Sequence, residues 1–389
     1  MTYDFIITGA GFAGSVLAER IATQMDKKVL VLEKRSHIGG NCYDEVDASG
    51  VIVHTYGPHL FHTDNAKVYH YLSQFTQWQP YVHKVVASVD EKIIPIPFNF
   101  NTLHEVYETN KAKRLEAKLI ENYGKEQKIP ILELRKSTDS DLQELADYVY
   151  EKIFVNYTAK QWGRKPEEID ASVTARVPIL TSYDNRYFTD RYQAVPREGY
   201  GKLFEKMLDH KNITVQLNCD ALERLEVKDN KLFFDRKSCE ATVIFTGMID
   251  ELFDDRYGRL PYRSIDLAFE TINREYYQDY AVVNYPNEHR YTRITEFKHI
   301  HPANTGKTTI LKEYPQRYER GENTPYYPMF TEENRQKYAQ YARDAAKIPN
   351  LLPVGRLAEY TYYDMDDIVA RALEIFDHQM GCVHQGIWS

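Results

Sequence analysis

The pattern of apolar and polar positions near the start of the chain predicts a strand, a helix and a second strand. Residues 3–8 and residues 29–33 each hold an apolar run. Between them, from about Ala13 to Met25, apolar positions recur at the spacing of a helix. Short runs that are apolar throughout are typical of parallel strands covered on both faces. The pattern therefore predicts an α/β fold that begins with a strand–helix–strand unit.

Later segments switch between the two-residue period of strands and the longer period of helices. Proline, glycine and asparagine or aspartate separate these segments and mark their ends. The pattern predicts, in chain order, a β-hairpin at 82–98 that turns at Asp90-Glu91-Lys92, a helical segment at 103–156, strands at 213–247, short strands at 262–313, a closing strand at 351–356 and a final helix opened by Asp364.

A glycine-rich turn connects the first strand to the first helix. Gly9, Gly11 and Gly14 form the pattern Gly-x-Gly-x-x-Gly, and Glu33 ends the second strand about 20 residues later. Gly9 allows the tight turn, Gly11 lets the backbone approach a pyrophosphate, and Gly14 lets helix and strand pack closely. The helix N-terminus then faces the phosphates, and Glu33 can bind a ribose hydroxyl. Strand, turn, helix and acid together indicate a dinucleotide-binding site.

The glycine motif alone is compatible with either NAD or FAD. Lys34, Arg35 and the turn Ile38-Gly39-Gly40-Asn41 follow Glu33. Such a glycine pair is typical of the second phosphate and ribose contact in flavoproteins, although an ordinary surface turn is the alternative. We therefore predict FAD. The helix opened by Asp364 would point its positive end at the flavin pyrimidine ring.

The chain has 389 residues, which favours two or three domains. We predict a Rossmann-like FAD-binding domain with a helical insert and an antiparallel-sheet insert. The approximate boundaries are 1–80, 195–250 and 345–389 for the FAD-binding domain, 100–172 for the helical domain, and 81–99, 173–194 and 251–344 for the antiparallel sheet, or substrate, domain.

Composition narrows the partners and the compartment. The net charge of −8 argues against nucleic-acid and anionic-membrane partners. No run approaches the length of about 18 apolar residues that a membrane span needs. The chain begins almost directly with a strand, so we expect no signal peptide. Its 4 cysteines are scattered without Cys-x-x-Cys spacing, which favours reduced thiols, no structural zinc and a cytoplasmic location.

Tyrosine is unusually frequent, at 31 residues. Aromatic rings can stack on a nucleobase, and arginines bind a pyrophosphate through forked, charge-assisted hydrogen bonds. For any single arginine the alternative is a surface ion pair. Five aromatic clusters favour a nucleotide site. Three of them also hold arginine or lysine and lie around Trp162, between Arg176 and Tyr192, and around Arg293; the other two lie at Tyr326 and Tyr327 and from Tyr360 to Asp366.

Two histidines, His59 and His62, lie three residues apart. No third ligand of matching type is near them in sequence, so we predict no metal site. A position beside the flavin is the better interpretation of the turn Gly57-Pro58-His59, and a structural role for His62 stays open. The sequence shows no Ser-His-Asp arrangement and no general-base dyad. The flavin would therefore carry the chemistry.

With these motifs in place, the chain resembles the bacterial type of UDP-galactopyranose mutase over nearly its whole length. The motifs that carry the resemblance are specific: the flavin fingerprint with Ile38 to Tyr43, Tyr56 to Thr63, Tyr157 to Gly163, Tyr291 to Glu296, and Tyr362 to Asp366.

The resemblance implies an isomerase that interconverts UDP-galactopyranose and UDP-galactofuranose for surface polysaccharides. It implies that reduced FAD is required without net redox change, and that flavin N5 is the nucleophile at the anomeric carbon. It leaves a monomer and a homodimer open, and it does not exclude UDP-N-acetylgalactosamine or UDP-arabinose as substrates.

The resemblance also implies residue roles. Arg176, Arg293 and His59 are the predicted catalytic residues, with Arg176 on a mobile loop and Arg293 fixed. The predicted cofactor-binding residues are Gly9, Gly11, Gly14, Glu33, Lys34, Gly40, Asn41, His59, Arg356, Asp364 and Met365. The predicted substrate-binding residues are Phe154, Tyr157, Trp162, Arg176, Tyr187, Asn284, Arg293, Tyr327 and Tyr362.

One departure from the family pattern is Ile153, where the family often has a second aromatic residue. The wall of the site that contacts the uracil base would therefore differ. The loop after Arg176 keeps the family's proline, Pro178, and little else. The alternative function is a flavin-dependent oxidoreductase of the amine-oxidase type. It would share the fold and FAD, but an apolar substrate would not need the clusters of arginine and tyrosine.

Overall fold

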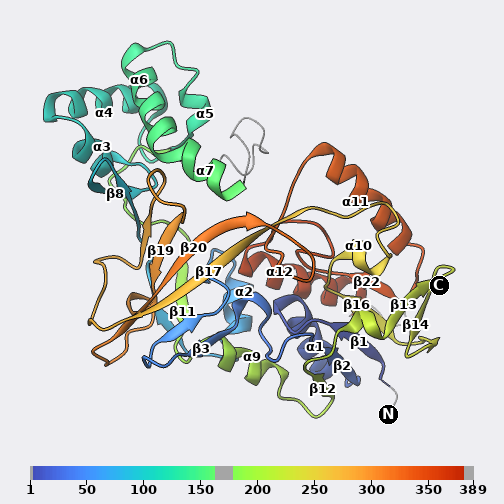
Figure 1. Ribbon diagram of the computed structural model, residues 1–389. Helices are drawn as coiled ribbons and strands as arrows, with labels where there is room; N and C mark the ends of the chain where they lie inside the picture. The colour runs from blue at the N-terminus through green and yellow to red at the C-terminus, as the bar shows by residue number, and fades with distance from the viewer. Residues whose placement is uncertain (1–2, 163–177, 381–389) are drawn as a thin grey trace.

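The computed structural model describes residues 3–162 and 178–380 (Figure 1). Its first layer is a five-stranded sheet in which all neighbouring strands run parallel. The strands β1 and β2 are buried at every position, as strands that are apolar throughout require. The predicted Rossmann-like fold is confirmed. In spatial order the strands are β12 (Ile213–Gln216), β2 (Val29–Leu32), β1 (Phe5–Thr8), β16 (Thr242–Phe245) and β22 (Leu351–Pro353).

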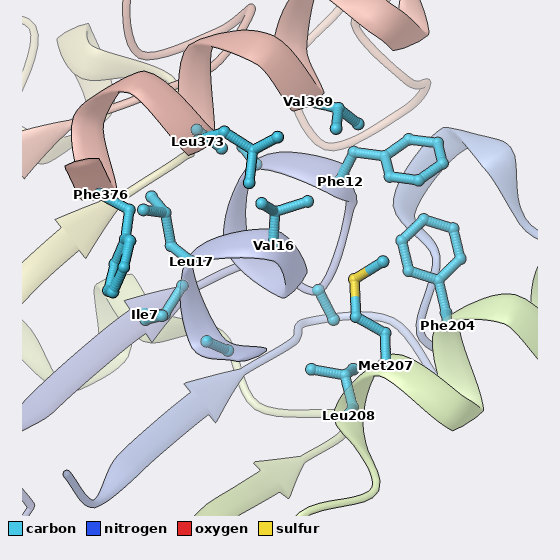
Figure 2. Close-up of a cluster of buried hydrophobic side chains, with 14 of the residues drawn as sticks. Ile7, Phe12, Val16, Leu17, Phe204, Met207, Leu208, Val369, Leu373 and Phe376 are labelled. Atoms are coloured by element: carbon cyan, nitrogen blue, oxygen red, sulfur yellow. The ribbon is translucent and has the colours of Figure 1, made fainter. Parts of the chain in front are cut away.

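Three helices cover one face of this sheet: α1 (Phe12–Gln24), α9 (Tyr200–Leu208) and α12 (Met365–Ile375). Figure 2 shows Val16 and Leu17 of α1 between Leu373 of α12 and Met207 of α9. Val16 and Leu17 are fully buried. Each such side chain contributes roughly 1.5–3 kcal/mol through burial, so this core fixes the turn that precedes α1.

The other face of the parallel sheet has a core of its own, because alternate strand residues point to opposite faces. Ile7 belongs to the first core, whereas Ile6 belongs to the second. The elements that cover this face are α10 (Ile249–Leu252), α11 (Glu332–Ala345) and the ribbon of β13 (Leu225–Lys228), β14 (Lys231–Phe234) and β15 (Lys237–Ser238).

A second sheet of seven strands lies beside the first (Figure 1). It is antiparallel at every pairing except that of β7 with β18, which is parallel. Its spatial order is β21 (Tyr327–Pro328), β17 (Tyr262–Ile272), β20 (Thr308–Arg317), β19 (Arg293–Glu296), β18 (Val282–Asn284), β7 (Val85–Val89) and β8 (Lys92–Ile96).

The hairpin expected at 82–98 is confirmed as β7 and β8. Its two turn residues, Asp90 and Glu91, have positive φ angles of 47° and 64°, which suits a two-residue hairpin turn. Pro95 lies within β8, which is the edge strand of the sheet. An edge position tolerates proline because its missing N–H is not needed by a further strand.

The segment expected to be helical from Leu103 to Asn156 is helical with one interruption. The strand β9 (Lys128–Pro130) pairs with β10 (Pro178–Leu180), so the prediction was wrong there: exposed charges mark α4 as amphipathic, but they do not show where it ends. The helices are α3 (Phe100–Val106), α4 (Thr109–Tyr123), α5 (Ile131–Leu134), α6 (Ser140–Val149), a π-helical turn (Tyr150–Phe154) and α7 (Val155–Trp162).

These helices and the β7–β8 hairpin share one hydrophobic core. Val85 and Ile94 of the hairpin pack with Leu115, Leu145 and Phe154 of the helices. In Figure 1, α3, α4 and α6 lie at the end of the second sheet that is farthest from the parallel sheet. The division into three domains with the boundaries given above stays a prediction.

The remaining elements are short. They are a 3-10 turn (Gly40–Cys42), β3 (Asp44–Val46), β4 (Ile52–His54), β5 (Phe61–Thr63), α2 (Ala66–Leu72), β6 (Trp78–Pro80), β11 (Tyr192–Pro196), 3-10 turns at Ala221–Glu223 and Phe297–His299, and a closing π-helical turn (Phe376–Met380). Within the described ranges, the helices are too short or too polar to cross a membrane. Cys42, Cys219 and Cys239 are free thiols.

We predict that Gly14→Ala lowers the free energy of unfolding by about 1–3 kcal/mol, the usual cost of overpacking. A Cβ at Gly14 would collide with the carbonyl oxygen of Gly9 and press on Ile7. The control is Gly306→Ala, where a Cβ would meet open space and should change stability by less than about 1 kcal/mol. Chemical denaturation measures both variants. Equal stability of the two would contradict the packing role of Gly14.

Candidate active site

The glycine turn after β1 and the turn at Ile38 to Asn41 pack directly against each other. Gly9 has a φ of +96°, which favours glycine. The backbones of Gly11 and Gly40 are in close contact. A Cβ on Gly40 would lie only 2.9 Å from the Gly11 Cα. The Gly39 N–H also donates to the Ala10 carbonyl at 2.8 Å. The two turns are distant in sequence, but they pack together into one surface made of backbone atoms. This surface is called the cradle below.

Glu33 and Arg35 border this cradle. Glu33 is buried, and its two carboxylate oxygens accept the N–H groups of Ala10 at 2.8 Å and Arg35 at 2.9 Å. The Arg35 guanidinium donates to Asn41 Oδ1 and lies 4.0 Å from the centre of the Tyr56 ring. Its Nη1 is buried with no hydrogen-bond partner among the described residues. A buried charged donor without a partner is costly, so the site suits an anionic ligand.

All the predicted cofactor residues except Gly14 line one pocket at this cradle. Gly14 lies behind it, where helix and strand meet. The lining residues from the prediction are Gly9, Gly11, Glu33, Lys34, Gly40, Asn41, His59, Arg356, Asp364 and Met365.

The N-terminus of α12 opens onto the same pocket through Asp364 and Met365. The Asp367 carboxylate accepts the N–H of Asp364, while the remaining first-turn N–H groups and the helix dipole favour negative charge. The cradle lets a ligand approach the backbone closely, Arg35 offers a donor for an anion, and the α12 N-terminus favours negative charge. Together these features fit a bound dinucleotide such as FAD.

A second pocket lies between α7 and the second sheet. It brings together four predicted substrate residues: Phe154, Tyr157, Tyr187 and Asn284. The Oδ1 of Asn284 is buried with no hydrogen-bond partner among the described residues. Aromatic walls with one unsatisfied amide suit a nucleobase, which is flat and carries hydrogen-bonding edges. The other lining residues are Ala87, Ile96, Pro97, Ile153, Thr158 and Pro286.

Arg293 is the strand partner of Asn284, which lines this second pocket. Asn284 and Arg293 are directly paired on the antiparallel strands β18 and β19. The Nε of Arg293 donates to Glu313 Oε1 at 2.7 Å, and Glu313 is buried. Burial alone would lower the pKa of Arg293, but the Glu313 carboxylate outweighs it and raises that pKa above its ordinary value. The guanidinium is therefore a fixed, permanent cation.

Tyr327, Tyr362 and Arg356 extend from Arg293 towards the cofactor pocket. The rings of Tyr327 and Tyr362 are stacked with centres 5.9 Å apart. The Arg356 guanidinium lies 5.0 Å from the centre of the Tyr362 ring and lines the cofactor pocket. Burial raises the pKa of Tyr327 to about 12, so its hydroxyl keeps its proton at neutral pH. A line of arginines and tyrosines therefore connects the two pockets.

His59 lies at the junction of this line with the cofactor pocket. Its Nδ1 is 2.7 Å from the Gly57 carbonyl oxygen, so Nδ1 carries the ring proton and donates it. Burial lowers the pKa of His59 to about 4, and the charges of Arg356 and Arg293 act in the same direction. The ring is therefore neutral near pH 7, and its Nε2 is an acceptor.

Comparisons with known proteins now bear on this site. A family model described as UDP-galactopyranose mutase matches residues 152–362, and one described as an NAD(P)-binding Rossmann-like domain matches residues 7–75. The chain is 36% identical over 379 residues to a UDP-galactopyranose mutase of Mycoplasma pneumoniae, covering 95% of this chain and 94% of that protein. The chain belongs to the UDP-galactopyranose mutase family.

Another relative of this chain has a different sugar nucleotide in its name. The chain is also 34% identical over 376 residues to a dTDP-fucopyranose mutase of Escherichia coli, with 95% of this chain and 96% of that protein covered. Among solved structures, a reduced UDP-galactopyranose mutase matches with a TM-score of 0.75 at 14% identity, covering 98% of this chain and 94% of that one. This likeness confirms the fold.

Membership of the mutase family confirms the resemblance and makes the protein an enzyme of the isomerase class. The match to a Rossmann-like dinucleotide-binding domain supports a dinucleotide cofactor, and FAD as that cofactor stays a prediction. The alternative of an amine-oxidase-type oxidoreductase shares the fold but not the family. The roles of the individual site residues stay predictions.

Two predicted site residues are beyond what the structure describes. Arg176 lies outside the described residues, and Trp162 ends α7 with a side chain that is not described. His62 stacks on Phe188 with ring centres 3.6 Å apart, and its Nδ1 is 3.2 Å from the Asp190 carboxylate. These contacts favour the structural interpretation of His62.

Sequence reasoning missed Glu313 and His83. Glu313 pairs directly with Arg293 across β19 and β20, and predicting that strand register would have found it. His83 is buried, and the Arg293 charge acts on it. Its carbonyl accepts the N–H of Tyr187 at 2.8 Å. A lone histidine before a strand carries no sequence signal of this kind.

We predict that His83 makes stability depend on pH. Burial, with smaller effects of Arg293 and His62, lowers the pKa of His83 to about 3. The unfolded chain, with an ordinary histidine pKa of about 6.5, therefore binds the proton first as the pH falls. Relative to His83→Gln, the wild-type free energy of unfolding should fall by about 1.4 kcal/mol for each unit between about pH 6.5 and pH 4.5. Denaturation at several pH values measures this difference, and parallel curves would contradict it.

Proposed function

We propose that this enzyme interconverts the pyranose and furanose forms of a UDP-linked galactose, with FAD in its reduced form and no net redox change. The observation that carries the proposal is the line from Asn284 and Arg293 through Tyr327 and Tyr362 to Arg356. It joins a pocket suited to a nucleobase with a pocket suited to a dinucleotide. A substrate that is a nucleotide at one end and a sugar at the other matches this arrangement.

The nucleobase would lie in the second pocket against Phe154 and Tyr157, with the Asn284 amide on its polar edge. Trp162 is proposed as a further base contact from its sequence motif. The unsatisfied Oδ1 of Asn284 would accept a base N–H. Ile153, rather than a second aromatic ring, lines this pocket, so one wall is aliphatic.

The diphosphate would lie at Arg293, with Tyr187, Tyr327 and Tyr362 around it and Arg176 proposed as the second arginine from its sequence motif. Negative charge builds on the diphosphate as the anomeric C–O bond breaks. A cation that is already fixed in place stabilises this state most. Glu313 holds Arg293 by a 2.7 Å bond from its Nε, which leaves the guanidinium's Nη groups for the phosphate.

The sugar would then lie at the junction, beside His59. When bound and reduced, FAD would supply a nucleophile for the anomeric carbon through its N5 atom. The neutral His59 ring presents an acceptor nitrogen there, and the Arg356 cation beside it disfavours protonation. His59 would accept a hydrogen bond from a sugar hydroxyl or from the cofactor. A cytoplasmic location stays a prediction, and a monomer and a homodimer both stay open.

The direct experiment incubates the dithionite-reduced protein with UDP-galactofuranose and, in parallel, with dTDP-fucofuranose. Chromatography follows the pyranose product. We expect conversion of the UDP sugar without stoichiometric consumption of reductant, and no conversion by oxidised protein. Faster conversion of the dTDP sugar would assign the substrate of the Escherichia coli relative instead. Oxidation of one reductant for each product would refute an isomerase.

We predict that Arg293→Ala lowers kcat by about 10²-fold or more, because it removes a preorganised donor from the leaving group. Arg293→Lys should recover little, since an ammonium cannot pair with Glu313 and a phosphate in the same forked manner. The matched control is Arg290→Ala, an exposed arginine three residues away, which should retain activity. Steady-state kinetics with reduced protein measures all three variants. Near-normal kcat in Arg293→Ala would remove Arg293 from the site.

A further inference from the structure

Beneath the histidine turn at Gly57 to His59 lies a buried cluster that the proposed function does not use. Asp44, His54 and His301 are all buried, and their ligand atoms lie within 4.8 Å of one another. His54 ends β4, and Asp44 is its direct partner on β3. His301 follows the 3-10 turn after β19. Three buried polar side chains from three elements need a reason to be there.

A metal ion is a poor explanation, because the donor atoms are already committed. The two Asp44 oxygens accept the N–H groups of Tyr200 and Gly201 at the start of α9. His54 Nδ1 accepts the N–H of His59 at 2.9 Å. A neutral His54 must then carry its proton on Nε2, which is the atom that faces the cluster. Binding a metal at Nε2 would require an imidazolate or the loss of the bond to His59.

The same bonds determine where each ring proton lies. The backbone N–H of His59 can only donate, so His54 Nδ1 is the acceptor and His54 Nε2 carries the proton. His54 Nε2 lies 2.9 Å from His301 Nε2, so His301 Nε2 must accept and its proton must lie on Nδ1. Burial lowers the pKa of His301 to about 4 and that of His54 well below its ordinary value. Both rings are therefore neutral near pH 7.

The outer end of this chain is His59, which lines the cofactor pocket. Its backbone N–H is fixed by His54, and its ring Nδ1–H is fixed by the Gly57 carbonyl at 2.7 Å. With both donors of His59 engaged, the ring has one orientation, and Nε2 is left as the acceptor. The rings of Phe297 and Tyr200 lie 5.4 Å and 5.7 Å from the His54 ring and keep it in place.

We propose that His54 and His301 are positioning residues. Through one fixed set of ring tautomers, they hold the turn from Gly57 to His59 so that His59 presents an unprotonated Nε2 to the cofactor pocket. The catalytic consequence rests on the proposed function, whereas the set of tautomers does not. The His59 N–H sets the tautomer of His54, and His301 supports that tautomer by accepting the His54 Nε2–H. In return His54 holds the backbone of His59, and the Gly57 carbonyl holds its ring. Among these hydrogen-bonded residues, only His59 lines the cofactor pocket, within the part of the protein that is described.

The first test reads the protons directly and needs no substrate. Protein labelled with ¹⁵N-histidine, with its flavin bound, is recorded in a long-range ¹H–¹⁵N experiment that reports the tautomer of each imidazole. His54→Asn, His59→Asn and His301→Gln assign the three rings by loss of their signals. We expect the Nε2–H tautomer for His54 and the Nδ1–H tautomer for His59 and His301. The Nδ1–H form on His54, or the Nε2–H form on His301, would overturn the proposal.

The second test uses matched replacements of His54. Asparagine keeps an acceptor at the position of Nδ1, whereas glutamine keeps a donor at the position of Nε2 and loses that acceptor. We expect His54→Asn to keep kcat within about threefold and His54→Gln to lower it by about tenfold or more, the range seen when a supporting hydrogen bond is lost. Equal kcat values for the two variants would refute the positioning role.

Replacements of His301 make the same distinction one step farther away. His301→Gln offers a carbonyl oxygen to the His54 Nε2–H, whereas His301→Leu offers no acceptor. We expect the His59 Nδ1–H signal to persist in the glutamine variant and to broaden or shift in the leucine variant. If the protein showed no mutase activity at all, these signals would still decide the proposal. An unchanged His59 signal in His301→Leu would refute it.

Discussion

The ion pair between Arg293 and Glu313 is the constraint on which the site depends. A guanidinium buried without a counter-ion would be costly. Glu313, directly opposite on β20, holds it by a 2.7 Å bond. The pair keeps one cation fixed between a pocket suited to a base and a pocket suited to a dinucleotide. The roles proposed for the tyrosines depend on that fixed charge, whereas His59 is held by His54 and the Gly57 carbonyl.

The two sheets contribute different parts of the site. The parallel sheet presents its glycine turns and the α12 N-terminus at one edge, as open α/β sheets do. The second sheet presents Asn284 and Arg293 from adjacent strands, and α7 closes the aromatic pocket over them. His54 and His59 lie in the segment that connects the two sheets. The position of the histidine turn therefore depends on how the two sheets are arranged relative to each other.

The sequence predicts the local parts of this site well, because their signals are local. The glycine turn and Glu33 follow one another on a strand–helix–strand unit, and Asp364 is followed by a helical pattern. Contacts that depend on strand register are different. Glu313 lies 20 residues from Arg293, and His301 lies 247 residues from His54. No spacing rule predicts that such residues touch. The family resemblance supplied Arg293, Tyr327 and Tyr362, and the structure supplied what holds them.

The central claim is that the two pockets form one continuous site in which a sugar reaches the cofactor only when its nucleotide is bound at Arg293. Titration of the reduced protein's flavin absorption spectrum with UDP-galactose tests this most directly. The account predicts a saturable spectral change that UDP alone does not cause, that excess UDP reverses, and that Arg293→Ala abolishes at the same ligand concentrations. A UDP-galactose titration that leaves the flavin spectrum unchanged, or a change that UDP cannot reverse, would contradict it.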